Sequence, residues 1–277
     1  WAGNYLAIDT YNVVINAASN VADELKESAE FVKGEALVAR AYSYLQLARH
    51  FGPKYSEFTA ETDLCVPLVT VSDLNAKPAR ATVKQVYDQI KSDLDTAITI
   101  LENAGAIGEA SSEYFTADFA KALRARYYLD IQDYENAAKQ AAEIIESKRY
   151  PLARTADELT ELCFNDNGTE ALMQLYVSKT EAPNSFNLFS GYAKDSNEKA
   201  VGGYSYNPLY IPSKKFIDSY STGDIRRNVW LTYTDKTLAN LNNNYLSNIY
   251  IFSKFLGNKE LSSSGTMTRW YSPAQPR

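Results

Sequence analysis

Aromatic and carboxamide side chains are the residues of this chain whose types and spacing suit ligand binding. Tyr204 and Tyr206 alternate in a glycine-containing segment after Tyr192, so an extended backbone would place them on one side. Trp1 and Asn4 are one helical turn apart, so that indole and amide share a face. Flat rings offer apolar faces on which a ligand can stack, and planar polar groups can hydrogen bond to its polar edge. We therefore predict a ligand site formed by Trp1, Asn4, Tyr192, Tyr204 and Tyr206.

The alternative for each ring is packing inside the protein, because large aromatic side chains mostly build cores. For Trp1 the alternative is a place in the core or at a helix end. For the tyrosines it is packing within their own segment. The chain is unusually rich in such rings, since it holds 21 tyrosines among 277 residues.

The usual residue sets of catalytic and metal sites are missing. His50 is the single histidine, which disfavours histidine-dependent triads and metal sites, and two cysteines are too few for a multi-cysteine zinc site. Cys65 and Cys163 are expected to be buried free thiols, and a single disulfide between them is the alternative. We predict no catalytic residue, no metal and no cofactor. The sequence does not exclude a pair of carboxylates that acts as in a glycosidase, because it does not give the distance between two acidic groups.

Charge and hydropathy disfavour two classes of partner. The net charge is −6, and no basic stripe is present to neutralise nucleic-acid phosphates. No apolar run approaches the roughly 18 residues of a membrane-spanning helix. Hydrophobic residues make up 45% and charged residues 22% of the chain, as in globular proteins that bury a large core.

A hydrophobic helix over residues 34–52 is the element around which we expect the chain to pack. Its apolar residues recur at steps of four and three, and Val38 and others widen this face, so other helices should cover it. Arg40, on the narrow polar stripe, is expected to pair with a carboxylate. Gly52 is expected to end the helix in the left-handed conformation, and Pro53 prevents continuation. The recurring apolar residues are Leu37, Ala41, Tyr44, Ala48 and Phe51.

Further helices are predicted around this one. Residues 1–18 have helical spacing and should pair with it in antiparallel fashion. Thr82 begins another helix, because Gln85 completes a capping box. A helix pair between Thr116 and Tyr150 carries residues at tetratricopeptide positions, although the Trp and first Gly of that repeat are absent.

After Pro151 the predicted elements become short. The long aromatic connection among them is of a kind that is uncommon and often functional. Asp224 and Arg226 are expected to form a structural ion pair rather than a ligand contact. We expect helices over Asp157–Phe164 and Ser213–Tyr220, strands over Ala171–Val177, Val229–Tyr233 and Ile249–Phe255, and the long connection over Ser178–Tyr210. The predicted fold class is mainly α, with tetratricopeptide-like helical repeats, long loops and a few short strands.

Several segments resemble the SusD/RagB-like family, nutrient-binding lipoproteins of the outer membrane in Bacteroidetes. The best match is the pattern E-A-x-x-x-R-A-Y-x-Y-x-x-L-x-x-x-F-G over Glu35–Gly52. Each segment is short, and their order over most of the chain carries the resemblance. The other matching segments are the W…Y..I…N pattern of 1–12, the V-Y-x-x-I-x-x-D-L-x-x-A pattern within 82–101, the helix pair 121–152 ending in Tyr-Pro-Leu, and the D-x-R of 212–227.

The resemblance implies a single SusD-like domain over 1–277, with a helical repeat part at about 1–152 and a loop-rich part with short strands at about 153–277. The family's lipid-attachment cysteine, first helix and C-terminal helix have no counterpart, so we expect a domain incomplete at both ends. In such receptors an early Trp and a nearby polar residue contribute to the glycan site, and Trp1 and Asn4 match those positions.

The resemblance also implies a function. It predicts a receptor exposed on the cell outer membrane, lipid-anchored in the full-length protein, that binds an oligosaccharide without cleaving it. Its partner would be a SusC-like TonB-dependent transporter. Two alternatives stay open: a tetratricopeptide scaffold that binds protein in a concave groove and leaves residues 186–206 idle, and a helical glycoside hydrolase.

Overall fold

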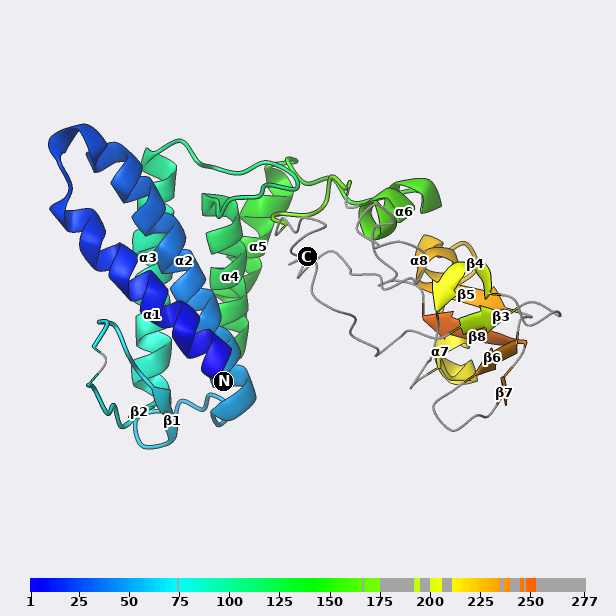
Figure 1. Cartoon of the computed structure of the whole chain (residues 1–277), viewed down its shortest axis with the longest axis horizontal. Helices are drawn as coiled ribbons and strands as arrows, with labels where there is room; N and C mark the ends of the chain where they lie inside the picture. Colours follow the sequence, from blue (N-terminus) through cyan, green and yellow to red (C-terminus); the bar gives the residue numbers. More distant parts are fainter. Residues whose placement is uncertain are drawn as a thin grey trace. The chain divides into compact units, whose positions relative to one another are not determined.

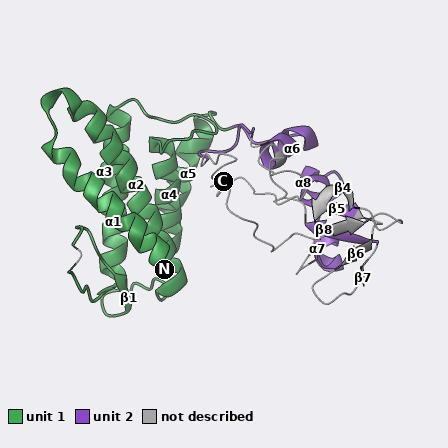
Figure 2. Ribbon diagram, in the orientation of Figure 1, with its two compact units in different colours: residues 1–150, 276 green, residues 151–275, 277 purple. Residues whose placement is uncertain are grey.

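The computed structural model describes residues 1–73, 75–165, 167–174, 192–194, 200–205, 211–234, 237–239, 245–246 and 248–252. Figure 2 shows the chain divided into two compact units, 1–150 and 151–275. Each unit is described by itself. The expectation that the whole chain forms one domain stays a prediction.

The first unit is helical and is built around the predicted central helix (Figure 1). That helix is α2, which packs against α1, α3 and α4, while α4 pairs with α5. Tyr44 and Leu47 are fully buried in it, as their spacing predicts. The helices of this unit are α1 (Ala2–Ala17), α2 (Lys26–Phe51), α3 (Val83–Asn103), α4 (Ala117–Asp130) and α5 (Tyr134–Glu146), with 3₁₀ turns η1 (Ala18–Asn20) and η2 (Asp23–Leu25) between α1 and α2.

Two predictions about helix ends on α2 differ from the structure. The helix begins at Lys26 rather than Gly34. Its first turn, residues 26–28, is polar and exposed, so the sequence shows no apolar periodicity there that would predict a helix. At the other end, Gly52 has φ −95° and ψ 164°, which is extended rather than left-handed. Glycine is needed there for space, since a Cβ would lie 2.5 Å from Cys65 Sγ and 2.7 Å from the Ala48 carbonyl oxygen.

The predicted capping box is confirmed, and side chains also cap the starts of α4 and α5. Thr82 and Gln85 form a complete capping box at the start of α3. The Thr116 hydroxyl accepts from the Phe119 backbone N–H, and the Asp133 carboxylate accepts from that of Asn136. These bonds satisfy backbone donors that a helix start leaves without intrahelical partners.

A small antiparallel sheet lies beside the helices. Its strands are β1 (Leu64–Pro67) and β2 (Arg80–Thr82). Cys65 in β1 is a buried free thiol, as predicted, and Cys163 of the second unit is also buried.

The second unit combines short helices with short strands. Its helices are α6 (Ala156–Phe164), α7 (Lys214–Asp218) and α8 (Ile225–Trp230). The strands β4 (Ala200–Ser205), β3 (Tyr192–Lys194), β6 (Thr237–Ala239) and β7 (Tyr245–Leu246) form one sheet in that order, and β5 (Leu231–Thr234) pairs with β8 (Ile249–Phe252). A core cluster joins α6 to α8 and consists of Leu159, Leu162, Cys163, Ala171 and Val229.

Several predicted bounds in this unit are corrected. Residues 171–174 form no strand, because their apolar side chains are buried as part of the core without sheet pairing. Val229 belongs to the end of α8, and the strand after it begins at Leu231. The connection 178–210 contains β3 and β4 and is therefore not structureless. Residues 175–177 and 253–255 of the predicted strands lie outside the described part of the chain.

The ion pair predicted at the start of α8 is confirmed. Asp224 caps the helix by accepting from the Arg226 backbone N–H at 3.0 Å, and its carboxylate pairs with the Arg226 guanidinium at 2.5 Å. The pair is partly exposed and local, which fits a structural role.

Candidate functional site

The start of α1 lies beside the end of α2 (Figure 1). A partly exposed group of aromatic rings lies at this place. The Trp1 ring centroid is 5.1 Å from that of Tyr5 and 5.1 Å from that of Phe51, which it meets edge to face at 87°. We call Trp1, Tyr5 and Phe51 the aromatic cluster. The antiparallel pairing of α1 and α2 brings these rings together from opposite ends of the first 51 residues of the chain.

The cluster has a fixed base and an open outer face. The Tyr5 hydroxyl donates to the Pro67 carbonyl at 2.7 Å, and burial raises the pKa of Tyr5, so the hydroxyl stays protonated. Trp1 is 52% exposed and Phe51 is 50% exposed, so neither ring is a core residue. Both rings therefore offer apolar surface to a ligand.

Asn4 follows Trp1 by one turn of α1 and is partly exposed. Its amide makes no hydrogen bond to the part of the chain that the structure describes, so both its donor and its acceptor are available to a ligand. An aromatic face with a free carboxamide beside it is the combination that sugar rings require.

The three tyrosines of the predicted site belong to the second unit. Tyr192 is in β3 and Tyr204 is in the neighbouring antiparallel strand β4, where Ser205 lies opposite Tyr192. Only the backbone of these two strands is described. Tyr206 lies outside the described residues.

Sequence reasoning missed two members of the aromatic cluster. It assigned Phe51 to the buried face of α2, yet the ring is half exposed because the helix ends there, beyond the packed part of its neighbours. Tyr5 was recognised only as part of the apolar face of its helix. The four-residue step from Trp1 to Tyr5 was the available signal for their contact.

A buried polar network links α1, α2 and α3. Arg40 forms two hydrogen bonds to Asp93, Nη2 to Oδ1 at 2.6 Å and Nε to Oδ2 at 2.8 Å. It also donates to the Asn12 side-chain oxygen at 2.8 Å, and the Gln89 amide donates to Asp93 at 2.7 Å. Arg40 is 5% exposed and Asp93 2%, so the predicted carboxylate partner is confirmed and the pair is buried.

The same helices hold the segment that follows β1. The Asn12 amide donates to the Val69 carbonyl at 3.0 Å, and the Tyr44 hydroxyl bonds to both the carbonyl (2.8 Å) and the N–H (2.7 Å) of Val69. Burial raises the pKa of Tyr44 to about 12, so its proton remains in place for this bond. With Tyr5 bonded to Pro67, the backbone on both sides of Leu68 is fixed.

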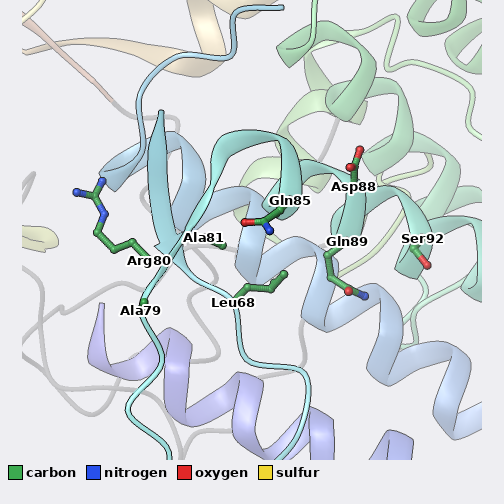
Figure 3. A pocket seen from close by; sticks show the side chains of 8 residues that line it. All are labelled: Leu68, Ala79, Arg80, Ala81, Gln85, Asp88, Gln89 and Ser92. Atoms are coloured by element: carbon green, nitrogen blue, oxygen red, sulfur yellow. The ribbon is translucent and has the colours of Figure 1, made fainter. Parts of the chain in front are cut away.

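A hollow of about 610 Å³ opens beside this fixed segment, between α3 and β2 (Figure 3). Figure 3 shows Gln89 and Ser92 extending from α3 on the side of Leu68, whereas Asp88 points the other way. The lining residues are Leu68, Ala79, Arg80, Ala81, Gln85, Asp88, Gln89 and Ser92.

Two features are absent from the part of the chain that the structure describes. No group of three or more His, Cys, Asp or Glu side chains there has the arrangement of a metal site. No helix there has the length and hydropathy needed to cross a membrane.

The comparisons with known proteins bear directly on these features. A family described as "Starch-binding associating with outer membrane", the third SusD-like family, matches residues 1–129. Residues 1–129 of this chain are therefore similar to a SusD-like family. That match covers α1 to α4 and therefore includes the aromatic cluster, Asn4 and the hollow.

Solved structures of the SusD superfamily share the fold. One from Bacteroides thetaiotaomicron is 25% identical with a TM-score of 0.71, covering 94% of this chain and 56% of the other. A putative sugar-binding protein from Bacteroides vulgatus is 22% identical with a TM-score of 0.70, covering 94% and 54%. A laminarin-binding SusD-like protein is 20% identical with a TM-score of 0.69, covering 98% and 62%.

The chain spans little more than half the length of the structures it matches. No curated protein matches it. The mainly helical fold with tetratricopeptide-like repeats, predicted from the sequence, is confirmed by the helical unit and by these structures.

Proposed function

We propose that this SusD-like chain is part of a receptor of the outer-membrane surface that binds an oligosaccharide and passes it to a SusC-like TonB-dependent transporter. The observation that carries the binding proposal is the aromatic cluster, with two half-exposed rings and the free amide of Asn4 beside them. The family's description as starch-binding and associating with the outer membrane supports the ligand class and the location.

Binding would need no covalent step. Trp1 and Phe51 offer ring surfaces at a large angle to each other, so a sugar that stacks on one ring meets the edge of the other. The Asn4 amide can donate to one hydroxyl and accept from another. We propose Tyr192, Tyr204 and Tyr206 as a further aromatic surface of the same receptor.

The names of the family and of one matched structure suggest two classes of probe. Starch fragments are α-linked glucose chains, and laminarin fragments are β-linked glucose chains. Isothermal titration of the chain with both series tests the proposal. We expect heat of binding from one series and unchanged chain lengths in the recovered sugar; shortened chains would instead indicate a glycoside hydrolase.

Replacing Trp1 by Ala should weaken this binding about tenfold, or about 1.4 kcal/mol, as the removal of one stacked ring does at other aromatic contacts. The loss is expected because the indole supplies half-exposed apolar surface next to Asn4. Isothermal titration with the same oligosaccharide measures the change.

Tyr134→Ala is the matched control, because Tyr134 on α5 is also exposed (64%) but lies outside the aromatic cluster. It should leave the affinity unchanged. Equal affinity in the Trp1 variant and in the unmodified chain would remove the cluster from the binding site. Absence of sugar binding together with binding of peptides would favour the tetratricopeptide scaffold.

A further inference from the structure

We propose that the hollow between α3 and β2 is a second sugar subsite, which takes a single neutral pyranose ring. The hollow shares no lining residue with the aromatic cluster. The proposal rests on the proposed function for its ligand class, and its experiment reads the two sites separately. The volume of the hollow, about 610 Å³, falls in the ~300–1,000 Å³ range of small-molecule sites.

The two walls of the hollow differ in chemistry. Gln85, Gln89 and Ser92 recur at steps of four and three along α3 and present neutral hydrogen-bonding groups. The facing wall consists of the apolar side chains of Leu68, Ala79 and Ala81. A pyranose has hydroxyls along its edge and C–H groups on its face, so it can satisfy both walls at once.

The charged residues of the lining are turned away or already paired. Arg80 donates to the Cys65 and Leu64 carbonyls, and Figure 3 shows its guanidinium on the side of β2 away from α3. Asp88 pairs with Lys84 at 2.6 Å and points away from Leu68. The interior is therefore electrically neutral, which favours an uncharged ligand over a phosphate or a carboxylate.

Gln85 and Gln89 are held in place by hydrogen bonds, and all three polar groups retain free hydrogen-bonding capacity. The Gln89 amide nitrogen donates to Asp93, which leaves its carbonyl oxygen free to accept. The Gln85 carbonyl accepts from the Thr82 N–H at 2.8 Å, which leaves its amide nitrogen free to donate. The Ser92 hydroxyl makes no hydrogen bond to the described residues. Groups oriented in advance lose little entropy when a ligand binds.

The apolar wall is equally fixed at Leu68. Its neighbours Pro67 and Val69 are bonded to Tyr5 of α1 and to Asn12 and Tyr44 of α1 and α2. Asp93, which orients Gln89, is itself held by the buried Arg40. One helical scaffold therefore positions both walls of the hollow.

Nuclear magnetic resonance titration of the full chain with D-glucose, the unit of starch and laminarin, tests the proposal. The side-chain amide signals of Gln85 and Gln89 report on the hollow, and the indole N–H signal of Trp1 reports on the aromatic cluster. We expect saturable shifts of both glutamine signals with a common binding constant.

Two variants close the hollow from opposite walls. Ser92→Leu removes a hydroxyl and adds an apolar chain on α3, and Ala79→Leu fills the space from the other side. Each should weaken the glucose response of Gln85 and Gln89 at least about tenfold. Thr96→Leu, an equally exposed change one turn further along α3 and outside the lining, should leave it unchanged.

Unmoved glutamine signals, or shifts that survive both closing variants, would overturn the subsite. Glutamine shifts without any response of the Trp1 indole would support the subsite and contradict the aromatic cluster as the receptor's binding surface. A response of the Trp1 indole without shifts of the glutamine signals would overturn the subsite and leave the proposed function standing.

Discussion

Replacing Arg40 by Ala is expected to lower the free energy of unfolding by about 3–5 kcal/mol, the usual cost of removing one partner of a buried ion pair. The variant leaves the Asp93 carboxylate almost fully buried, with only Gln89 of its described partners still donating to it. It also removes the hydrogen bond that Arg40 donates to the Asn12 side-chain oxygen. The Asn12 amide nitrogen in turn donates to the Val69 carbonyl. Urea unfolding followed by the helical circular dichroism signal measures the loss.

The matched control is Arg49→Ala. Arg49 and Asp130 form the same pair of bonds, at 2.7 and 2.8 Å, but their side chains are 32% and 19% exposed. Water can then solvate the carboxylate that remains, so we expect a loss of about 1 kcal/mol. Equal losses in the two variants would show that burial does not set the cost of breaking the Arg40 pair.

The Arg40→Ala loss should depend on pH in a defined direction. Burial raises the pKa of the Asp93 carboxyl, and the bonds from Arg40 oppose that rise, so removing Arg40 raises the pKa further. A carboxyl with a raised folded-state pKa contributes stability below its unfolded value, about 3.9, and that stability is lost as pH rises through the folded pKa. The deficit of the variant should therefore be smaller near pH 4 than at pH 7.

The helical unit was largely predictable because its signals are local. The capping box at Thr82 and the apolar stripe that follows it fix α3 within a few residues of sequence. The first turns of α2 carried no such signal, since their polar side chains face water in a helix and in a loop alike. In the second unit the apolar run at 171–174 indicated burial, but burial in a core and pairing in a sheet give the same short pattern.

The candidate sites were predictable only where one helix supplies the residues. Trp1 and Asn4 lie one turn apart, so their shared face follows from the sequence. The contact between Trp1 and Phe51 depends on how two helices pair, which local spacing does not contain. The hollow was missed because Gln85, Gln89 and Ser92 look like a solvated helix face until the segment at Leu68 is placed opposite them.

Replacing Gly52 by Ala is expected to destabilise the chain by about 3 kcal/mol, at the upper end of the usual cost of overpacking. The backbone of Gly52 is extended and open to any residue, so the cost is purely one of space. The new methyl would approach Cys65 Sγ at 2.5 Å and the Ala48 carbonyl oxygen at 2.7 Å; the first ends a short, buried side chain and the second belongs to the backbone. Urea unfolding measures the change.

Gly3→Ala provides the control, because the same methyl meets nothing within 4 Å on the exposed start of α1. It should stabilise the chain by about 0.5–1 kcal/mol, since alanine orders a helix at lower entropic cost than glycine. A destabilised Gly3 variant would mean that the space around the added methyl group does not determine the change in stability.

The Gly52→Ala/Cys65→Ala double variant separates the two contacts of the new methyl. Removing the sulfur relieves the clash with Cys65 but leaves the one with the Ala48 carbonyl, so the double variant should lose less stability than the sum of the single variants. Strict additivity would place the whole cost at the Ala48 carbonyl. In that case glycine would be required by the end of α2 itself, and not by the approach of β1 to the helix.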